Sequence, residues 1–347
     1  MRYIAIEKLE RGMMLGMDIY DGKGRVLLEQ GTILVSDEIQ MLQGIGCTGV
    51  YIEDSFSEEV SVSMAISQEL RQEALKMVNS LFQDDGLEGV GKEEILAVTQ
   101  RIIEELRGKE QKIFDKMDVK LYDDYTYFHS VEVAVLSAVL GLGCGMEPEE
   151  LNTLVVAALL HDIGKRFVEE DVLNAKRRLT DEERVLIVQH PKLGYEFLRE
   201  RFGFPEEVCF YVLEHHEWYN GGGYPLRKSG SDIPLIARIV KMADVYDAMT
   251  SKLPYHSPLL PTSVAEYIIE NAGAEFDPEL VEVFRQRVAM YPAGCEVVLS
   301  NGDTALVLEN RIGAALEPKV KVIPTGEVID LSSEENTKGL TILELLL

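Results

Sequence analysis

The sequence has few cysteines and no arrangement of them that indicates a disulfide framework or a structural zinc site. Its four thiols are scattered over 347 residues, and no two of them form a C-x-x-C pair; they are Cys47, Cys144, Cys209 and Cys295. Secreted proteins held together by disulfides, and zinc modules with thiolate ligands, are therefore excluded. We expect a reducing, cytoplasmic setting.

Long apolar runs are also absent. The longest covers residues 154–160, whereas a helix that crosses a bilayer needs about 20 apolar residues. The first eight residues contain no apolar signal region. The sequence therefore predicts no membrane span and no signal peptide.

Positive charge is scarce. Lys and Arg number 34 against 60 Asp and Glu, so the formal net charge is −26. A surface this negative repels polymeric nucleic acid and anionic membranes at long range. If the substrate is an anion, a local feature must reverse the sign of the field, and a metal site would do so.

Periodicity divides the chain into four regions, whose compositions are those of an ordinary globular protein. Residues 1–56 are a small β-rich region with a hairpin signal at Asp21-Gly22-Lys23-Gly24. Residues 57–117 are a helical connector whose first helix starts near position 58, with Ser55 and Glu58 as a capping box. We favour a connecting bundle, with dimerisation as a further role, over catalysis.

The last two regions differ sharply from each other. Residues 118–290 are rich in helical patterns, broken near 141–148, 203–205, 221–225 and 253–261. Residues 291–347 form a small β-rich region with two hairpin signals. The first is Asn301-Gly302, which predicts a type I′ turn, and the second is Pro324-Thr325-Gly326.

The histidines are concentrated in the helix-rich region. The chain has six, and five lie between residues 129 and 216. Structural histidines would be more evenly spread, although His129 and His190 would mean little alone. His161 and Asp162 follow an apolar helix, and adjacent residues of these types can hold one metal while the carboxylate reaches a second.

Two further pairs strengthen the metal interpretation. His215 and His216 diverge by about 100° on a helix, so they serve either two ions or one ion and one outer contact. Asp244 and Asp247 have i, i+3 spacing and share one helix face. A buried pair of carboxylates is costly unless it is paired or bound to metal.

Five imidazoles with two or three carboxylates suit a binuclear centre of Fe, Mn or a similar metal. Two cations would attract a phosphate ester, lower the pKa of a bridging water and hold the oxygens of an in-line displacement. The sequence contains no P-loop and no G-x-S-x-G elbow. These patterns therefore favour metal-dependent phosphoester hydrolysis over nucleotide-driven or covalent chemistry.

These residues and their neighbours resemble the HD-GYP domain phosphodiesterases, a branch of the HD metal-dependent phosphohydrolases. The resemblance runs in order over residues 120–290, half of the chain. Its most specific segments are Tyr127-Phe128-His129-Ser130, His161-Asp162-Ile163-Gly164-Lys165, His190-Pro191-Lys192-Leu193-Gly194, residues 215–225 and Ala243-Asp244-Val245-Tyr246-Asp247-Ala248.

The resemblance implies a mainly α fold, with an all-helical HD-GYP core and small β-rich appendages at both ends. It implies hydrolysis of cyclic di-GMP to linear pGpG, and onward to GMP, through a hydroxide that bridges the metals. Asp162 and Lys165 would be catalytic, and Lys165, Tyr224 and Asp247 would bind substrate. The implied ligands are His129, His161, Asp162, His190, His215, His216 and Asp244.

Three departures from the family pattern refine this hypothesis. Tyr125 stands where members with three metals carry Glu, so we expect two divalent ions, Fe or Mn. Asn220 replaces the Asp that usually precedes the first glycine of the loop. The Arg-Pro-Tyr-Arg segment appears as Leu253-Pro254-Tyr255-His256, without either basic residue.

The last departure keeps two alternatives open. One is a weak or inactive HD-GYP protein that binds a cyclic dinucleotide or a partner, and the other is a phosphodiesterase for a different cyclic dinucleotide, such as cyclic GMP-AMP. The predicted partners are therefore a cyclic dinucleotide, a second copy of the chain at the connector, and a signalling protein at the GYP loop.

Overall fold

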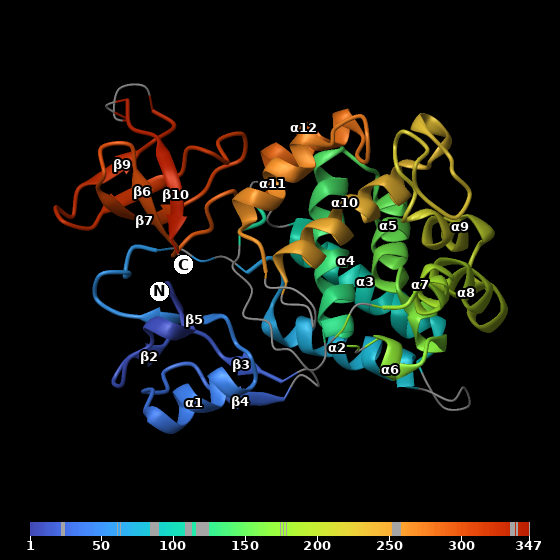
Figure 1. The fold of residues 1–347 in the computed structure, drawn as a ribbon, viewed down its shortest axis with the longest axis horizontal. Coiled ribbons are helices and arrows are strands. Elements are labelled where there is room, and N and C mark those ends of the chain that lie inside the picture. The colour runs from blue at the N-terminus through green and yellow to red at the C-terminus, as the bar shows by residue number, and fades with distance from the viewer. Residues whose placement is uncertain are drawn as a thin grey trace.

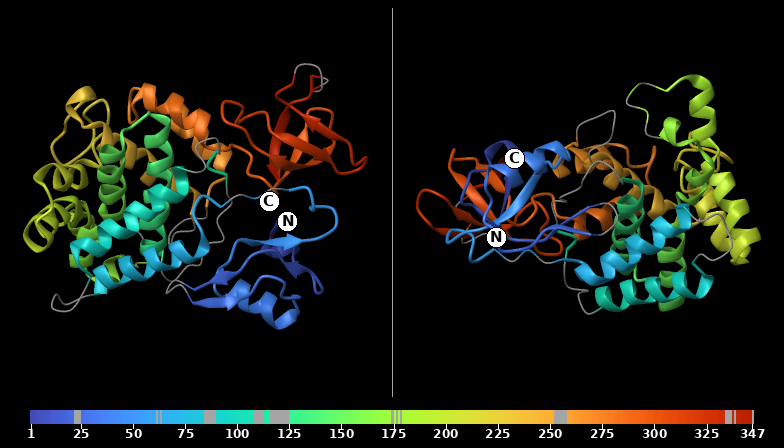
Figure 2. Two further views of the ribbon diagram at one scale, coloured as in Figure 1. Left: turned by 180° about the vertical axis from the view of Figure 1, so that it is seen from behind. Right: turned by 90° about the horizontal axis from the view of Figure 1, so that it is seen from below.

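The computed structural model describes residues 1–21, 25–60, 62, 64–83, 90–107, 113–115, 125–173, 175, 177, 179–251, 258–333, 337 and 339–346. Helices gather on one side of the molecule, and the strands from the two chain ends lie together on the other (Figure 1). The views from behind and from below show the same division (Figure 2). The predicted fold class, a mainly α core with β-rich ends, is confirmed.

In its described residues, the N-terminal β region contains five short strands, the short 3-10 helix η1 (Ile6–Lys8) and one α-helix. Strands β1 (Arg2–Ala5), β5 (Gly49–Glu53) and β2 (Met14–Leu15) form an antiparallel sheet in that order, and β3 (Ile19–Tyr20) pairs with β4 (Val26–Leu28). The β3–β4 hairpin was predicted, although its turn lies outside the described residues. Helix α1 (Ser36–Gly44) was missed, because it is short and only Leu42 on it is buried.

The connector helices are α2 (Gln68–Gln83) and α3 (Lys92–Arg107). The predicted start of the first helix near residue 58 is wrong, and so is the capping box at Ser55. Ser67 precedes α2, and its hydroxyl accepts a hydrogen bond from the backbone N–H of Leu70. The apolar side chains of Val62 and Ile66 continue the helical spacing, but they lie ahead of the helix, where Ile66 is buried and Val62 is partly buried.

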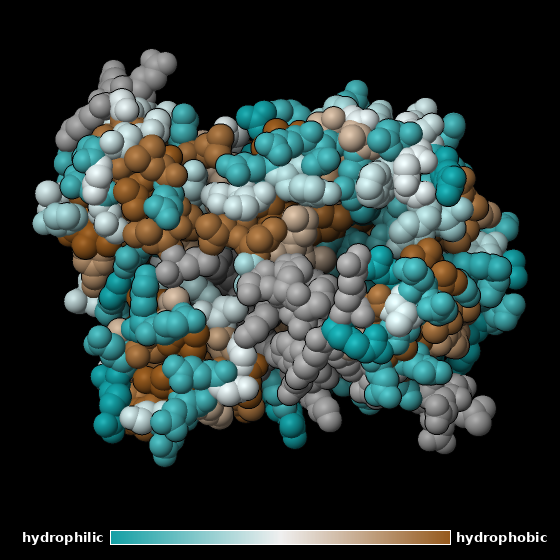
Figure 3. All heavy atoms as spheres, viewed as in Figure 1, coloured by the Kyte–Doolittle hydropathy of each residue, from teal (hydrophilic) through white to brown (hydrophobic). Residues whose placement is uncertain are grey.

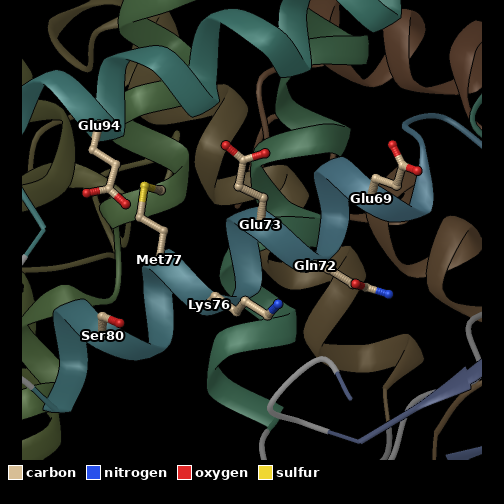
Figure 4. Close-up of a pocket in the computed structure, with 7 residues that line it drawn as sticks. All are labelled: Glu69, Gln72, Glu73, Lys76, Met77, Ser80 and Glu94. Atoms are coloured by element: carbon tan, nitrogen blue, oxygen red, sulfur yellow. The ribbon is translucent and has the colours of Figure 1, made fainter. Parts of the chain in front are cut away.

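Both connector helices belong to the helical core. Their apolar stripes, including Leu70, Ala74, Val98 and Ile102, are buried in one cluster with the helices that follow. The surface that α2 leaves open is polar: a pocket of about 370 Å³ there is lined by Glu69, Gln72, Glu73, Lys76, Met77, Ser80 and Glu94 (Figure 4). The apolar stripes of both helices are therefore buried within one chain. They give no support to the homodimer, which stays a prediction.

The helical core is centred on α4 (Tyr125–Gly143), which packs against α2, α5, α10 and α12. By length and composition α4 could cross a membrane, but 78% of its apolar window, residues 126–143, is buried inside the protein, as in the core helix of a bundle. The other elements are α5 (Pro148–Leu160), η3 (Ile163–Phe167), α6 (Glu170–Leu173), α7 (Asp181–Val188), α8 (His190–Phe197), η4 (Leu198–Phe202), α9 (Glu206–Glu214), η5 (Gly230–Asp232), α10 (Leu235–Thr250), α11 (Pro261–Glu270) and α12 (Pro278–Arg287).

The C-terminal β region is one antiparallel sheet with the order β10-β6-β7-β8-β9. Its strands are β6 (Glu296–Leu299), β7 (Thr304–Glu309), β8 (Lys319–Val322), β9 (Val328–Asp330) and β10 (Ile342–Leu346), so both predicted hairpins are confirmed. The predicted type I′ turn is wrong. Gly302 has a φ of +88°, but Asn301 has no positive φ, whereas a type I′ turn needs two.

The two β regions pack together. Tyr3 and Tyr51 lie in one apolar cluster with residues of the C-terminal sheet such as Val297, and the Tyr3 N–H donates to the carbonyl of Gly294 at 2.8 Å. Apolar side chains also gather on the surface of the C-terminal region (Figure 3). The sequence predicts two appendages, and the structure joins them through a shared core that connects the chain ends.

A buried carboxylate lies where the β regions meet the helices. Asp115 accepts hydrogen bonds from the Ala293 N–H at 2.7 Å and from the Asn310 side-chain amide at 3.1 Å. Burial raises its pKa to about 6, against the lowering effect of both hydrogen bonds. The folded protein therefore holds this proton to a higher pH than the unfolded chain does.

We expect this difference to make folding stability depend on pH. The contribution of Asp115 is complete below about pH 4 and is lost as pH rises to about 6, a change of roughly 3 kcal/mol in the free energy of unfolding. Asp115→Asn should remove this slope. The test is urea unfolding of both proteins from pH 4 to pH 7, and an equal difference between them at every pH would contradict the assignment.

Candidate functional site

The predicted ligands come from five separate parts of the helical core and meet at one place. Six of the seven side chains form two groups in which every ligand atom lies within 4.8 Å of the others: His129, His161 and Asp162 in one, and His190, His215 and His216 in the other. All are buried except His216, which is half-buried. The histidine concentration seen in the sequence therefore corresponds to one cluster in space.

Asp162 lies between the two groups. Its Oδ1 is 3.2 Å from His190 Nε2, and its Oδ2 is 3.5 Å from His161 Nε2 and 3.7 Å from His129 Nε2. Each oxygen thus faces a different group. A carboxylate with this geometry can bridge two cations.

Asp244 closes the other side of the cluster. Its Oδ1 is 3.0 Å from His129 Nε2, and its Oδ2 is 3.9 Å from His216 Nδ1. Burial raises the pKa of this carboxyl, but the neighbouring His129, His216 and His161 hold it well below its usual range. Asp244 is therefore ionised and reaches both groups.

Three of the histidines are oriented by carbonyl groups in the last turn of a helix. The Nδ1 atoms of His161, His190 and His215 lie 2.6–2.7 Å from carbonyl oxygens three residues earlier, those of Ala158, Ile187 and Val212. The last carbonyls of a helix have no partner within it, so they accept the Nδ1 protons. Each Nε2 is then left as a bare acceptor that points into the cluster.

The Nε2 atoms of His190 and His215, both bare acceptors, face each other 3.2 Å apart. The Nε2 of His129 lies 3.3 Å from that of His161 and 3.0 Å from Asp244 Oδ1. Opposed lone pairs such as those of His190 and His215 repel unless a positive charge lies between them. This donor set fits divalent cations of the borderline type.

Asp247 lies behind His129 and away from the cluster centre. Its Oδ2 is 2.7 Å from His129 Nδ1, the nitrogen opposite the one that faces Asp244, and the residue is only 5% exposed. Burial lowers the pKa of His129, but hydrogen bonds to Asp244 and Asp247 together raise it to about 9. This geometry places Asp247 against the imidazole of His129, and the substrate contact predicted for Asp247 stays a prediction.

Lys165 brings positive charge to the edge of the cluster. Its Nζ is 2.5 Å from Asp162 Oδ2, and its side chain is 23% exposed, so an incoming anion can reach it. Burial raises the pKa of Asp162, but Lys165 and the surrounding histidines hold it well below its usual range.

The glycine-rich loop, residues 217–225, covers the second group. The ring of Tyr224 stacks on that of His216, with centroids 4.8 Å apart and an interplanar angle of 24°. A Cβ on Gly223 would lie 2.3 Å from the backbone nitrogen of Trp218, so only glycine fits there. Asn220 turns the loop by accepting from the Gly222 N–H at 2.9 Å.

Sequence reasoning missed the residue that closes this loop. Glu217 is buried, and its carboxylate accepts hydrogen bonds from three consecutive backbone N–H groups, those of Leu226, Arg227 and Lys228, at 2.5–3.1 Å. Its position directly after two histidines could have marked Glu217 as a residue with a role. The sequence pattern does not, however, distinguish a Glu that binds a loop from one that is exposed to solvent.

Two further predictions fall outside what the structure describes. They concern the side chain of Tyr125 and the segment Leu253-Pro254-Tyr255-His256.

Comparison with known proteins supports the sequence resemblance. The family model described as the HD domain matches residues 99–280. A cyclic di-GMP phosphodiesterase of Pseudomonas aeruginosa is 37% identical over 207 residues, which cover 59% of this chain and 49% of that protein. A 3'3'-cGAMP-specific phosphodiesterase of Vibrio cholerae is 31% identical over 156 residues, or 45% of this chain and 30% of that protein.

A solved structure shows the same fold. It is an HDG"Y"P protein of Bdellovibrio bacteriovorus, with a TM-score of 0.50 at 14% identity, and the match covers 81% of this chain and 97% of that one. The chain spans about half the length or less of the curated relatives described above.

Proposed function

Because this chain belongs to the HD domain family, we propose that it is a metal-dependent phosphodiesterase that hydrolyses a cyclic dinucleotide. Cyclic di-GMP is the first candidate, since the Pseudomonas aeruginosa relative acts on it. The proposed product is linear pGpG, with further hydrolysis to GMP. The enzyme class and the substrate both rest on relatives that this chain covers only in part.

One observation carries the proposal: imidazole nitrogens and carboxylate oxygens converge on two adjoining points. The contact of 3.2 Å between the bare Nε2 atoms of His190 and His215 needs positive charge to be stable. HD-domain phosphohydrolases are metal-dependent, and these buried groups can hold metal ions.

We assign the ligands to two ions. His129, His161 and Asp244 would hold the first, His190, His215 and His216 the second, and Asp162 would serve both. Fe or Mn suits a set of imidazoles and carboxylates without thiolates. When bound, such ions supply Lewis-acid activation of water and of the phosphodiester.

The protein's own residues bind and orient the substrate. Lys165 would contact a phosphate oxygen and offset the negative charge that develops there, because its partly exposed ammonium lies at the edge of the cluster. Tyr224 would line the substrate pocket from the loop, and its ring is already held by His216. Asp247 would keep His129 in the tautomer whose Nε2 faces the site.

The test is anaerobic incubation of the protein, loaded with Fe(II) or Mn(II), with cyclic di-GMP and separately with cyclic GMP-AMP. We expect linear dinucleotide or GMP to appear, and expect His161→Ala with Asp162→Ala to abolish it. No turnover of either compound, with two ions per chain confirmed, would reject the enzymatic proposal.

Two other roles would then be measured in the same samples. Leu253 and His256 stand where the family pattern has two basic residues. This difference favours either a different cyclic dinucleotide as substrate or binding without turnover. Faster turnover of cyclic GMP-AMP would support a different substrate, and tight binding of a cyclic dinucleotide without product would support a binding role. A cytoplasmic location, a homodimer and a signalling partner at the GYP loop remain proposals.

A further inference from the structure

A buried lysine lies behind the proposed metal site and is not one of its ligands. Lys241 is three residues before Asp244 on α10, so the two side chains leave the same face of the helix. Its Nζ is 2.6 Å from Oε1 of Glu275, and the two residues are 6% and 7% exposed. Oε2 of Glu275 accepts a hydrogen bond from the Tyr267 hydroxyl at 2.6 Å. Both oxygens of this carboxylate are therefore used.

The segment that carries Glu275 also holds the base of the glycine-rich loop. The carbonyl of Glu275 accepts from the Tyr219 N–H at 3.1 Å, and that of Ala274 accepts from the Asn220 N–H at 2.9 Å. Tyr224 lies a few residues further along the loop, stacked on His216. A continuous path thus runs from Lys241 through Glu275 and the loop backbone to the ring of Tyr224.

We propose that Lys241 is a positioning residue: through Glu275 it fixes the glycine-rich loop and thereby the ring of Tyr224 at the site. The inference rests on the function proposed above. A buried ammonium needs its carboxylate partner, because an unpaired charge in the protein interior is strongly unfavourable. Glu275 is held from both sides, by Lys241 and by Tyr267, so the backbone that anchors the loop has one favoured position.

The experiment uses the full chain with Lys241→Met, and it has two independent readouts. The first is steady-state hydrolysis of cyclic di-GMP, for which we expect KM to rise about tenfold while kcat stays within about threefold, since substrate placement is lost and the ligands are kept. The second is acrylamide quenching of Trp218, the only tryptophan in the chain, which lies in the loop. We expect its quenching constant to rise about twofold, because a loop that opens locally exposes its side chains.

The matched control is Arg238→Met. Arg238 lies one turn earlier on α10 and pairs with the buried Asp277, whose Oδ1 accepts from the N–H of Glu279 at the start of α12. This variant also removes an ion pair between α10 and the segment near residue 275, so it should lower the melting temperature. It should leave KM and the quenching of Trp218 unchanged.

Equal KM and equal quenching in Lys241→Met and Arg238→Met would overturn the proposal. If Lys241→Met does not fold, Tyr267→Phe replaces it, because loss of one hydroxyl should move both readouts in the same direction by about a third as much. If the unaltered protein turns over no cyclic dinucleotide, the function proposed above fails, and the quenching of Trp218 alone then decides whether Lys241 positions the loop.

Discussion

Asp162→Asn is expected to lower kcat by at least about a thousandfold, because metal-assisted catalysis contributes several kcal/mol and this residue serves both groups. Its two oxygens face His190 on one side and His161 and His129 on the other. An amide offers one neutral oxygen in place of two charged ones. We therefore expect both ions to bind more weakly, which metal analysis after dialysis would show together with the turnover rate.

Asp247→Asn is the matched control, since it removes the same charge from the same side-chain type nearby. Asp247 contacts the outer nitrogen of His129 at 2.7 Å and belongs to neither of the two groups of possible ligands. Loss of an orienting partner of this kind typically costs about 10–100-fold. Retention of both ions by Asp162→Asn, or an equal loss in the two variants, would show that Asp162 does not bridge.

The cluster of possible metal ligands could be predicted from the sequence, because it depends on residue types that are visible there. His161 with Asp162, and His215 with His216, are neighbours in the sequence, so each pair can be recognised as a short motif. Few arrangements other than metal binding bring such pairs into one helical region. The orientation of Asp247 could not be predicted in the same way. An i, i+3 pair shares a helix face, but the ring of His129 lies between Asp244 and Asp247 and separates their roles.

The fold shows the same contrast between local and long-range information. Hairpins such as β6–β7 follow from turn residues, and helix α5 follows from an apolar stretch after Pro148. The joining of β1 to the C-terminal sheet depends on contacts between residues nearly 300 positions apart, such as Arg2 with Glu296 at 2.8 Å. Periodicity in one sequence carries no information about such pairs.

Gly164→Ala is expected to damage both stability and the second ligand group. A Cβ at this position would lie 1.9 Å from the carbonyl oxygen of His190 and 2.6 Å from the nitrogen of Gly194, and both are backbone atoms. Neither can rotate away, so η3 and α8 must separate. Overpacking of this kind costs about 1–3 kcal/mol or more in the free energy of unfolding.

The functional loss follows from the same displacement, because the atom that must move belongs to His190, one of the proposed ligands. A shift of about 1 Å in an active site can reduce turnover about 100-fold, and here it would draw His190 away from His215. Gly44→Ala is the control: a Cβ there meets no atom within 4 Å at the end of α1, so stability should be unchanged or raised by up to about 1 kcal/mol. Urea unfolding and kcat at saturating metal measure both effects, and a Gly164→Ala protein that matches Gly44→Ala in both would show that η3 and α8 are not held in this close contact.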